Sequence, residues 1–181
     1  MPLDLDELPV VERIVQTLVG RIARVRLAEC FNVELVQVVR PSRVGGYSPQ
    51  HGTAVVEQLD PDIDDELSVP GNPPLIAYKQ PLTVALYVLQ SDTDTTPLDL
   101  LVNLFRADVE QAITQYPDPR WQEFDGLALH AGFDKPLLFG KRPQGGRLIG
   151  DRATGDGQFA GITLKLNVIY RTPLGDPYTV G

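Results

Sequence analysis

The sequence predicts a compact α/β domain, and this prediction rests on one strand, the helix after it, and the overall composition. Residues 82–90 alternate with a period of two and are largely apolar on both faces, which is typical of a central strand buried on both sides. Residues 97–113 place apolar side chains on one helical stripe, and Thr-Pro-Leu-Asp at 96–99 is a typical helix start. The 181 residues, 43% of them hydrophobic, suit a single domain.

The N-terminal part predicts a helix followed by a strand. In residues 8–27 apolar side chains repeat at three- and four-residue steps, and charged residues, including Arg21, take the opposite face. Residues 33–40 alternate as a strand that ends at Pro41. The single cysteine, Cys30, cannot form an internal disulfide, and we expect it to be a small buried residue.

Residues 41–74 are predicted to form a long, loop-rich segment. A glycine pair at 45–46 predicts a tight turn, and residues 53–59 have the pattern of a short return strand. Residues 57–66 are acidic and contain no basic side chain. Because little apolar area is available there to offset the entropy of ordering, we expect this acidic segment to be mobile in an isolated subunit.

The C-terminal part predicts strands separated by a basic loop. Residues 75–79 are expected to form a short strand that bends or lies at an edge, because Pro81 cannot donate a ladder hydrogen bond. A short strand is expected around His130, and residues 162–171 alternate as a strand with one solvated face. Between them, residues 135–157 are rich in glycine and basic side chains and predict a second loop.

Composition and charge narrow the classes of function. The sequence contains no run of about 18 apolar residues, so it predicts no membrane span. The acidic N-terminus lacks the basic and apolar regions of a secretory signal. The net charge of -8 disfavours nucleic-acid binding as the main role, since proteins that grip phosphates usually carry the opposite sign.

No motif predicts a catalytic, cofactor or metal site. The acidic run lacks the glycine and the final glutamate of an EF-hand loop, and His51 and His130 lack the spacing of zinc ligands. The Gly140-Lys141 pair lacks the spacing of a phosphate-binding loop. There is no G-x-S-x-G motif, although a Ser-His-Asp arrangement assembled from distant residues stays open.

The distribution of charge predicts a contact between two segments. The negative segment holds Asp60, Asp62, Asp64, Asp65 and Glu66, and the positive segment holds Lys141, Arg142, Arg147 and Arg152. Either one chain folds the two together, or each subunit's acidic segment meets its neighbour's basic segment in a head-to-tail contact that closes into a ring. A further candidate contact residue is Trp121, which either packs on the core or anchors a subunit interface.

Residues 161–177, with the sequence GITLKLNVIYRTPLGDP, resemble the C-terminal part of the tail terminator proteins of tailed bacteriophages. These proteins are also called tail-completion or minor tail proteins. The resemblance lies in an alternating strand that ends in Tyr-Arg-Thr at 170–172 and in the short Gly-Asp-Pro tail at 175–177. The predicted order of elements along the rest of the chain is similar as well.

This resemblance implies both a fold and a role. The fold would be a single α+β domain over residues 1–181, with a mixed, mainly antiparallel sheet, two main helices packed on one face, and long loops. The role would be structural: a hexameric ring in the virion, assembled in the host cytoplasm, that caps the tail tube and ends its polymerisation. Its partners would be the tail-tube protein and a head-neck connector or stopper, with DNA passing through unbound. The family carries no catalytic residues and no cofactor, and it implies no membrane contact.

Two other classes of function stay open on the sequence. The first is another neck ring protein, such as a connector or stopper, or a tail-tube subunit. The second is a small α/β enzyme, which would need a pocket lined by convergent polar groups.

Overall fold

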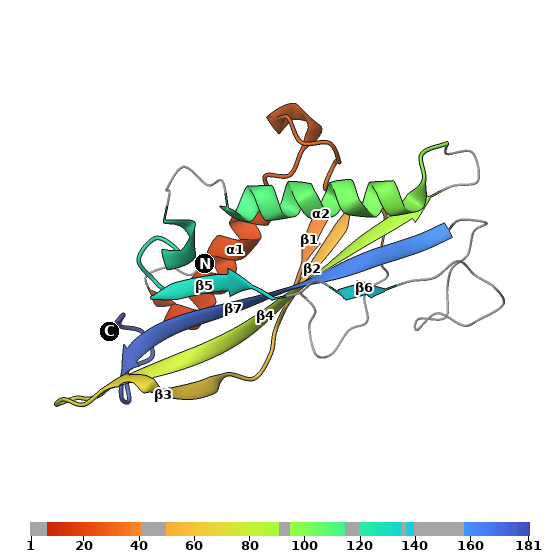
Figure 1. Cartoon of the computed structure of the whole chain (residues 1–181). Coiled ribbons are helices and arrows are strands. Elements are labelled where there is room, and N and C mark those ends of the chain that lie inside the picture. Colours follow the sequence, from red (N-terminus) through yellow and green to blue (C-terminus); the bar gives the residue numbers. More distant parts are fainter. Residues whose placement is uncertain (1–6, 41–49, 91–94, 115–119, 135–136, 140–157) are drawn as a thin grey trace.

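The computed structural model describes residues 7–40, 50–90, 95–114, 120–134, 137–139 and 158–181. In this part of the chain, helices and one sheet form two layers (Figure 1). The helical segments are α1 (Val10–Ile22), η2 (Leu27–Glu29), α2 (Leu98–Thr114) and η3 (Trp121–Glu123). The strands are β1 (Gln37–Val39), β2 (Thr53–Gln58), β3 (Asp62–Val69), β4 (Leu75–Gln90), β5 (His130–Phe133), β6 (Leu137–Phe139) and β7 (Gln158–Pro173).

The sheet is mixed and mainly antiparallel, so the predicted α+β class is confirmed. Its main strand order is β1-β2-β4-β7-β5, with β3 beside β4 and β6 beside β7. Only the β1–β2 pair is parallel among the described strands. Strands β4 and β7 pair along their whole length, from Leu75 opposite Pro173 to Gln90 opposite Gln158. This long pair is the spine of the sheet: β2 and β3 pair with β4, β5 and β6 pair with β7, and β1 joins through β2.

Both long helices pack on the same face of the sheet (Figure 1). On that face the even-numbered residues of β4 from Leu82 to Val88 are at most 1% exposed, and they meet the apolar stripes of α1 and α2. On the other face Thr83 is 8% exposed and Leu89 reaches 36%. The prediction of a strand buried on both sides is therefore correct for the helical face and only partly correct for the other, because no described helix covers that side.

The strand predicted at residues 75–79, bent or at a sheet edge, is instead the first part of a continuous β4 that passes through Pro81 and pairs on both sides. In an antiparallel strand the N–H and C=O of one residue point to the same neighbour, and the Pro81 carbonyl accepts a bond from Leu59 N (3.1 Å) on the β2–β3 side. The missing Pro81 donor therefore removes no hydrogen bond to β7. On the β2–β3 side the fully buried Gln80 amide donates to both the Leu59 and Pro81 carbonyls. The Leu59 carbonyl thus receives a hydrogen bond from a side chain, because the neighbouring Pro81 has no N–H to donate.

Several other predicted boundaries differ from the structure. Helix α1 ends at Ile22 rather than residue 27, and the strand predicted at residues 33–40 is reduced to Gln37–Val39. Because the helix stops early, Cys30 lies exposed at the left-handed end of η2, and the prediction that it is buried is wrong. Helix α2 begins at Leu98, directly after Pro97, within one residue of the prediction.

The short strand predicted at residues 53–59 is confirmed as β2, at 53–58. The prediction that the acidic stretch forms a mobile loop is wrong, because residues 62–69 form strand β3. Composition failed here because β3 takes its order from backbone hydrogen bonds to β4 rather than from its own buried side chains. The turn predicted at 45–46 lies outside the described residues. Of the basic loop predicted at 135–157, residues 137–139 form strand β6, and the rest lies outside the described residues.

Candidate interaction surface

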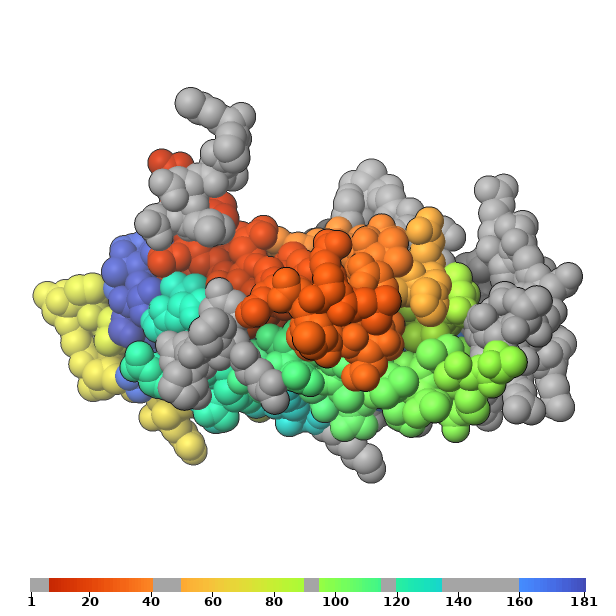
Figure 2. Space-filling model, turned by 90° about the horizontal axis from the view of Figure 1, so that it is seen from above, coloured from red at the N-terminus to blue at the C-terminus, as the bar shows by residue number. Residues whose placement is uncertain are grey.

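One end of the sheet extends past the helices as an arm, which we define as β3 together with residues 75–81 of β4 and 167–173 of β7. Strand β3 and its turn into β4 project at this end, in yellow in Figure 2. Among the described strands, β3 pairs with β4 alone, so its other side is an open sheet edge. Open edges present unpaired backbone donors and acceptors and readily bind another strand.

A local irregularity shapes β3. Its register against β4 shifts between Asp64 and Val69. The Asp64 carboxylate accepts a hydrogen bond from Leu67 N (3.1 Å), and the Asp64 carbonyl accepts one from the Ser68 hydroxyl (2.8 Å). That hydroxyl in turn accepts from Ala77 N (3.0 Å), which ties the bulge to β4. Asp64 is therefore a structural residue of the bulge.

Two kinds of side chain lie along the edge of the arm, acidic and apolar. Four of the predicted contact residues, Asp62, Asp64, Asp65 and Glu66, lie on β3, and Asp60 lies in the turn before it. Apolar side chains lie among them, with Ile63 61% exposed and Val69 40% exposed. Exposed aliphatic side chains on an open edge strand are typical of a surface that another chain covers.

The root of the arm is held by an aromatic pair. Tyr78 on β4 and Tyr170 on β7 are direct cross-strand partners, and their rings stack with centroids 5.4 Å apart. Burial raises the pKa of the Tyr170 hydroxyl to about 12, and the neighbouring Tyr78 adds to the shift. This pair fixes the arm to the core, because Tyr170 belongs to the buried cluster under the helices.

The motif that carries the family resemblance forms the end of β7 and the turn after it. Asp176 accepts hydrogen bonds from Tyr178 N (3.0 Å) and from the Thr179 hydroxyl (2.6 Å), and the Thr179 bond lowers the pKa of its carboxyl. The Pro177 carbonyl accepts from Val10 N (2.9 Å), so the tail also caps the first turn of α1. The Gly-Asp-Pro segment therefore stabilises the C-terminal turn and the start of α1.

Trp121 packs against the core. Its ring stacks on Phe133 of β5 at 5.7 Å between centroids, and the side chain is only partly buried. Of the two predicted roles for Trp121, the packing role is therefore seen directly. The exposed part of the ring leaves the interface role as a prediction.

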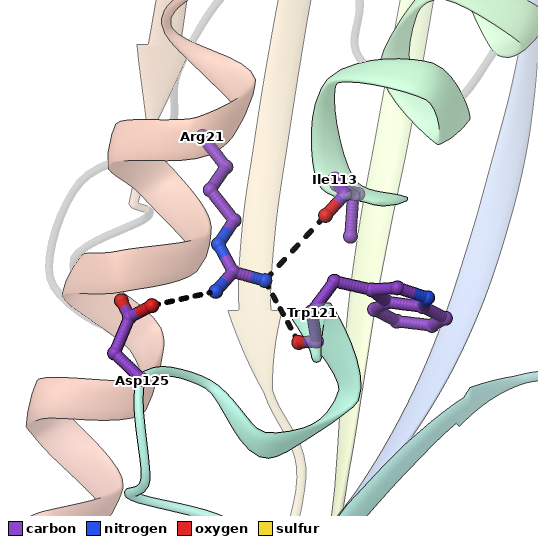
Figure 3. A network of polar contacts seen from close by, with 4 residues as sticks. All are labelled: Arg21, Ile113, Trp121 and Asp125. Carbon is purple, nitrogen blue, oxygen red and sulfur yellow. Dashed lines mark hydrogen bonds and ion pairs between the residues drawn. The ribbon is translucent and has the colours of Figure 1, made fainter. Parts of the chain in front are cut away.

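Arg21 is a buried polar residue, contrary to its predicted place on the solvent face (Figure 3). Predicted on the solvent face of α1, it is 1% exposed and points to the end of α2 and to η3. Its guanidinium donates to Trp121 O (2.9 Å) and Ile113 O (3.5 Å), pairs with Asp125 at 3.4 Å, and lies 4.7 Å from the centre of the Phe124 ring. The signal was in the sequence, because Arg21 lies three residues after Leu18 and thus on the apolar stripe.

Asp108 is a second buried polar residue without a sequence prediction. It is 1% exposed on α2, and its carboxylate accepts from Asn32 N (2.7 Å), Asn32 Nδ2 (2.7 Å) and Val33 N (2.8 Å). It thereby pins the connection between η2 and β1 to the second helix. Both Arg21 and Asp108 hold loops in place, and neither lies on the exposed arm.

The described residues bring together no group of three or more His, Cys, Asp or Glu side chains able to hold a metal ion. His51 lies beside β4, where its Nδ1 is 2.8 Å from Leu89 O, whereas His130 is exposed at the start of β5. Within the same ranges, no helix is long and apolar enough to cross a membrane. The basic residues Lys141, Arg142, Arg147 and Arg152 lie outside the described residues.

The chain matches no model of a protein family, and a search of curated proteins finds no match either.

Proposed function

We propose that this protein is a ring-forming structural subunit of a phage tail or neck, acting as a tail terminator that caps the tail tube. The observation that carries the proposal is the stretch Gly161–Pro177, which resembles the terminator family and forms the central strand β7 and the turn that caps α1. The fold agrees with the one that this resemblance implies, with two helices on one face of a mixed sheet.

Two features of the surface support an assembling subunit. The arm offers an open edge and exposed aliphatic side chains, which favour contact with another chain. The net charge of -8 suits a channel through which DNA passes, because six copies would carry about -48 and repel phosphate. In the proposed virion the ring would contact the tail-tube protein on one side and a connector or stopper on the other.

Electron microscopy of tail tubes tests this role. Polymerising the cognate tail-tube protein with this protein present should give shorter tubes, each ending in one ring, while this protein alone should form no filaments. Filaments of this protein alone would identify a tube subunit. Tubes of unchanged length without bound rings would contradict the terminator role and favour another neck protein or an enzyme.

A further inference from the structure

We propose that the open edge of β3 is a subunit interface that receives the basic segment, residues 140–152, of a second copy of this chain. This inference rests on the proposed ring and specifies the contact that closes it. Three observations carry it: the open edge with its exposed aliphatic side chains, the acidic charge along that edge, and the place where the basic segment is attached to the sheet.

The two segments are attached to opposite edges of the same sheet. Strand β3 lies beside β4, whereas β6, which leads into the basic segment, lies beside β7 on the far side. Phe139, the last residue of β6, pairs with Gly161, while Asp62 lies in the row of Lys79 and Ile169. From Gly161 to Ile169 the strand rises roughly 27 Å, and three strand spacings add about 14 Å sideways. The two sites are therefore about 30 Å apart within one chain.

Covalent reach then decides between the two predicted arrangements. Lys141 and Arg142 follow Phe139 by two and three residues, so their backbone lies within about 11 Å of it. Arg152 precedes Gln158 by six residues, which allows roughly 22 Å, and Gln158 lies still farther from the arm than Gly161. Only Arg147 reaches β3 of its own chain, at full extension. Lys141, Arg142 and Arg152 can therefore contact the acidic edge of another chain but not that of their own.

A head-to-tail contact follows from this placement. Each copy presents an acidic edge on one side and a basic segment on the other, so each copy contacts one neighbour through its edge and another through its basic segment. Such contacts close into a ring when the rotation between neighbouring copies divides a full turn evenly. Along the edge, Ile63 and Val69 would be covered together with the acidic side chains. Charge on an open edge and a bulge also protect a strand against indiscriminate pairing, and reversal of the charges separates that role from an interface.

Two charge-reversal variants test the interface. Asp65 and Glu66 are exposed, and Asp64 is left unchanged because it holds the bulge. The double variant Asp65→Lys/Glu66→Lys should raise the concentration of half-assembly by about tenfold or more, and Arg142→Glu/Arg147→Glu should do the same, because each sets like charges against each other. The matched control Glu7→Lys/Glu29→Lys, with the same change in charge at exposed sites off the arm, should assemble as the wild type does.

Mixing the two variants gives the sharper result. An equimolar mixture should restore rings that alternate the two variants, detected by native mass spectrometry under the conditions in which the wild type assembles. If each variant, shown by circular dichroism to be folded, assembles as the wild type does, or if the mixture fails to restore rings, the interface is wrong while the ring stands. A wild type that never forms rings, alone or on tubes, overturns the proposed function as well.

Discussion

At the scale of single residues, two buried charged side chains explain how loops are held against the helical layer. Arg21 and Asp108 each lie on the apolar stripe of a helix, three residues after Leu18 and Phe105, and each serves main-chain groups of a neighbouring loop. A pattern that counts only apolar residues assigns such positions to solvent. Their burial depends on partners that fold against them from about 75–100 residues away in the chain, which no local pattern contains.

Replacing Arg21 by methionine should lower the free energy of unfolding by roughly 2–4 kcal/mol. The apolar stem is kept, but the carbonyls of Trp121 and Ile113 lose their donor. Urea denaturation followed by circular dichroism measures the change. The matched variant Arg106→Met removes a half-exposed pair with Glu110 and should cost no more than about 0.5 kcal/mol. Equal losses in the two variants would contradict the assigned role of Arg21.

Tyr170 should ionise late in an alkaline titration. Its pKa in the folded protein is raised to about 12 from an ordinary value of 10.0. Since the folded state holds this proton more tightly, the stabilisation is complete below pH 10 and is lost as the pH rises towards 12. Absorbance at 295 nm should show a late component that disappears in Tyr170→Phe and persists in Tyr178→Phe, whose ring is 52% exposed. A late component that survives in Tyr170→Phe would contradict this assignment.

At the scale of elements, the sequence predicts those helices and strands that hydrophobic periodicity and helix caps determine. It does not predict those that depend on pairing between strands distant in the chain. Strand β7 and helix α2 were found because alternation and a helical stripe each report one buried face. Strand β3 was missed because its acidic side chains resemble a solvated loop, while its order comes from hydrogen bonds to β4. Pro81 suggested a bend or an edge position, whereas β4 continues through Pro81 and the Gln80 amide bonds the Leu59 carbonyl beside it.

Gln80→Leu should lower the free energy of unfolding by about 1–3 kcal/mol, because a side chain of similar size would bury the Leu59 carbonyl without its donor. Thermal unfolding measures the shift. Gln122→Leu, at an exposed position of η3, is the control and should change stability by less than about 0.5 kcal/mol. An unchanged melting temperature in Gln80→Leu would show that the Gln80 bonds do not support the β2–β3 connection.

The contact between α1 and the end of β1 should make stability depend on acid pH. Arg40 hydrogen-bonds Glu12, including a contact of 2.9 Å, and lowers the pKa of that carboxyl below its ordinary 4.5. The stabilisation is therefore present above pH 4.5 and is lost as the pH falls through the lower folded pKa. Both side chains are partly exposed, so the effect should stay below about 1 kcal/mol.

Urea midpoints between pH 6 and pH 3 test this pair. Glu12→Gln should flatten the decline in stability relative to the wild type, whereas Glu29→Gln, at an exposed position in η2, should leave it unchanged. A decline of the same slope in Glu12→Gln and in the wild type would exclude Glu12 as a contributor.

At the scale of the whole molecule, the sheet has a protected face and exposed edges. The helices and the C-terminal tail cover one side of the β4–β7 spine, and the arm extends beyond them with its edge open (Figures 1 and 2). The charges of the two candidate segments are visible in the sequence, but only the strand order shows that β3 and β6, which leads into the basic segment, lie on opposite sides of the β4–β7 pair. Strand order depends on long-range pairing, which a local pattern does not encode.

The most direct test of the ring is to count the copies in the assembly. Native mass spectrometry of the wild-type protein over a range of concentrations, with and without the tail-tube protein, should give six copies, either in solution or only on tubes. A protein that stays monomeric at every concentration and ignores the tubes would contradict the account.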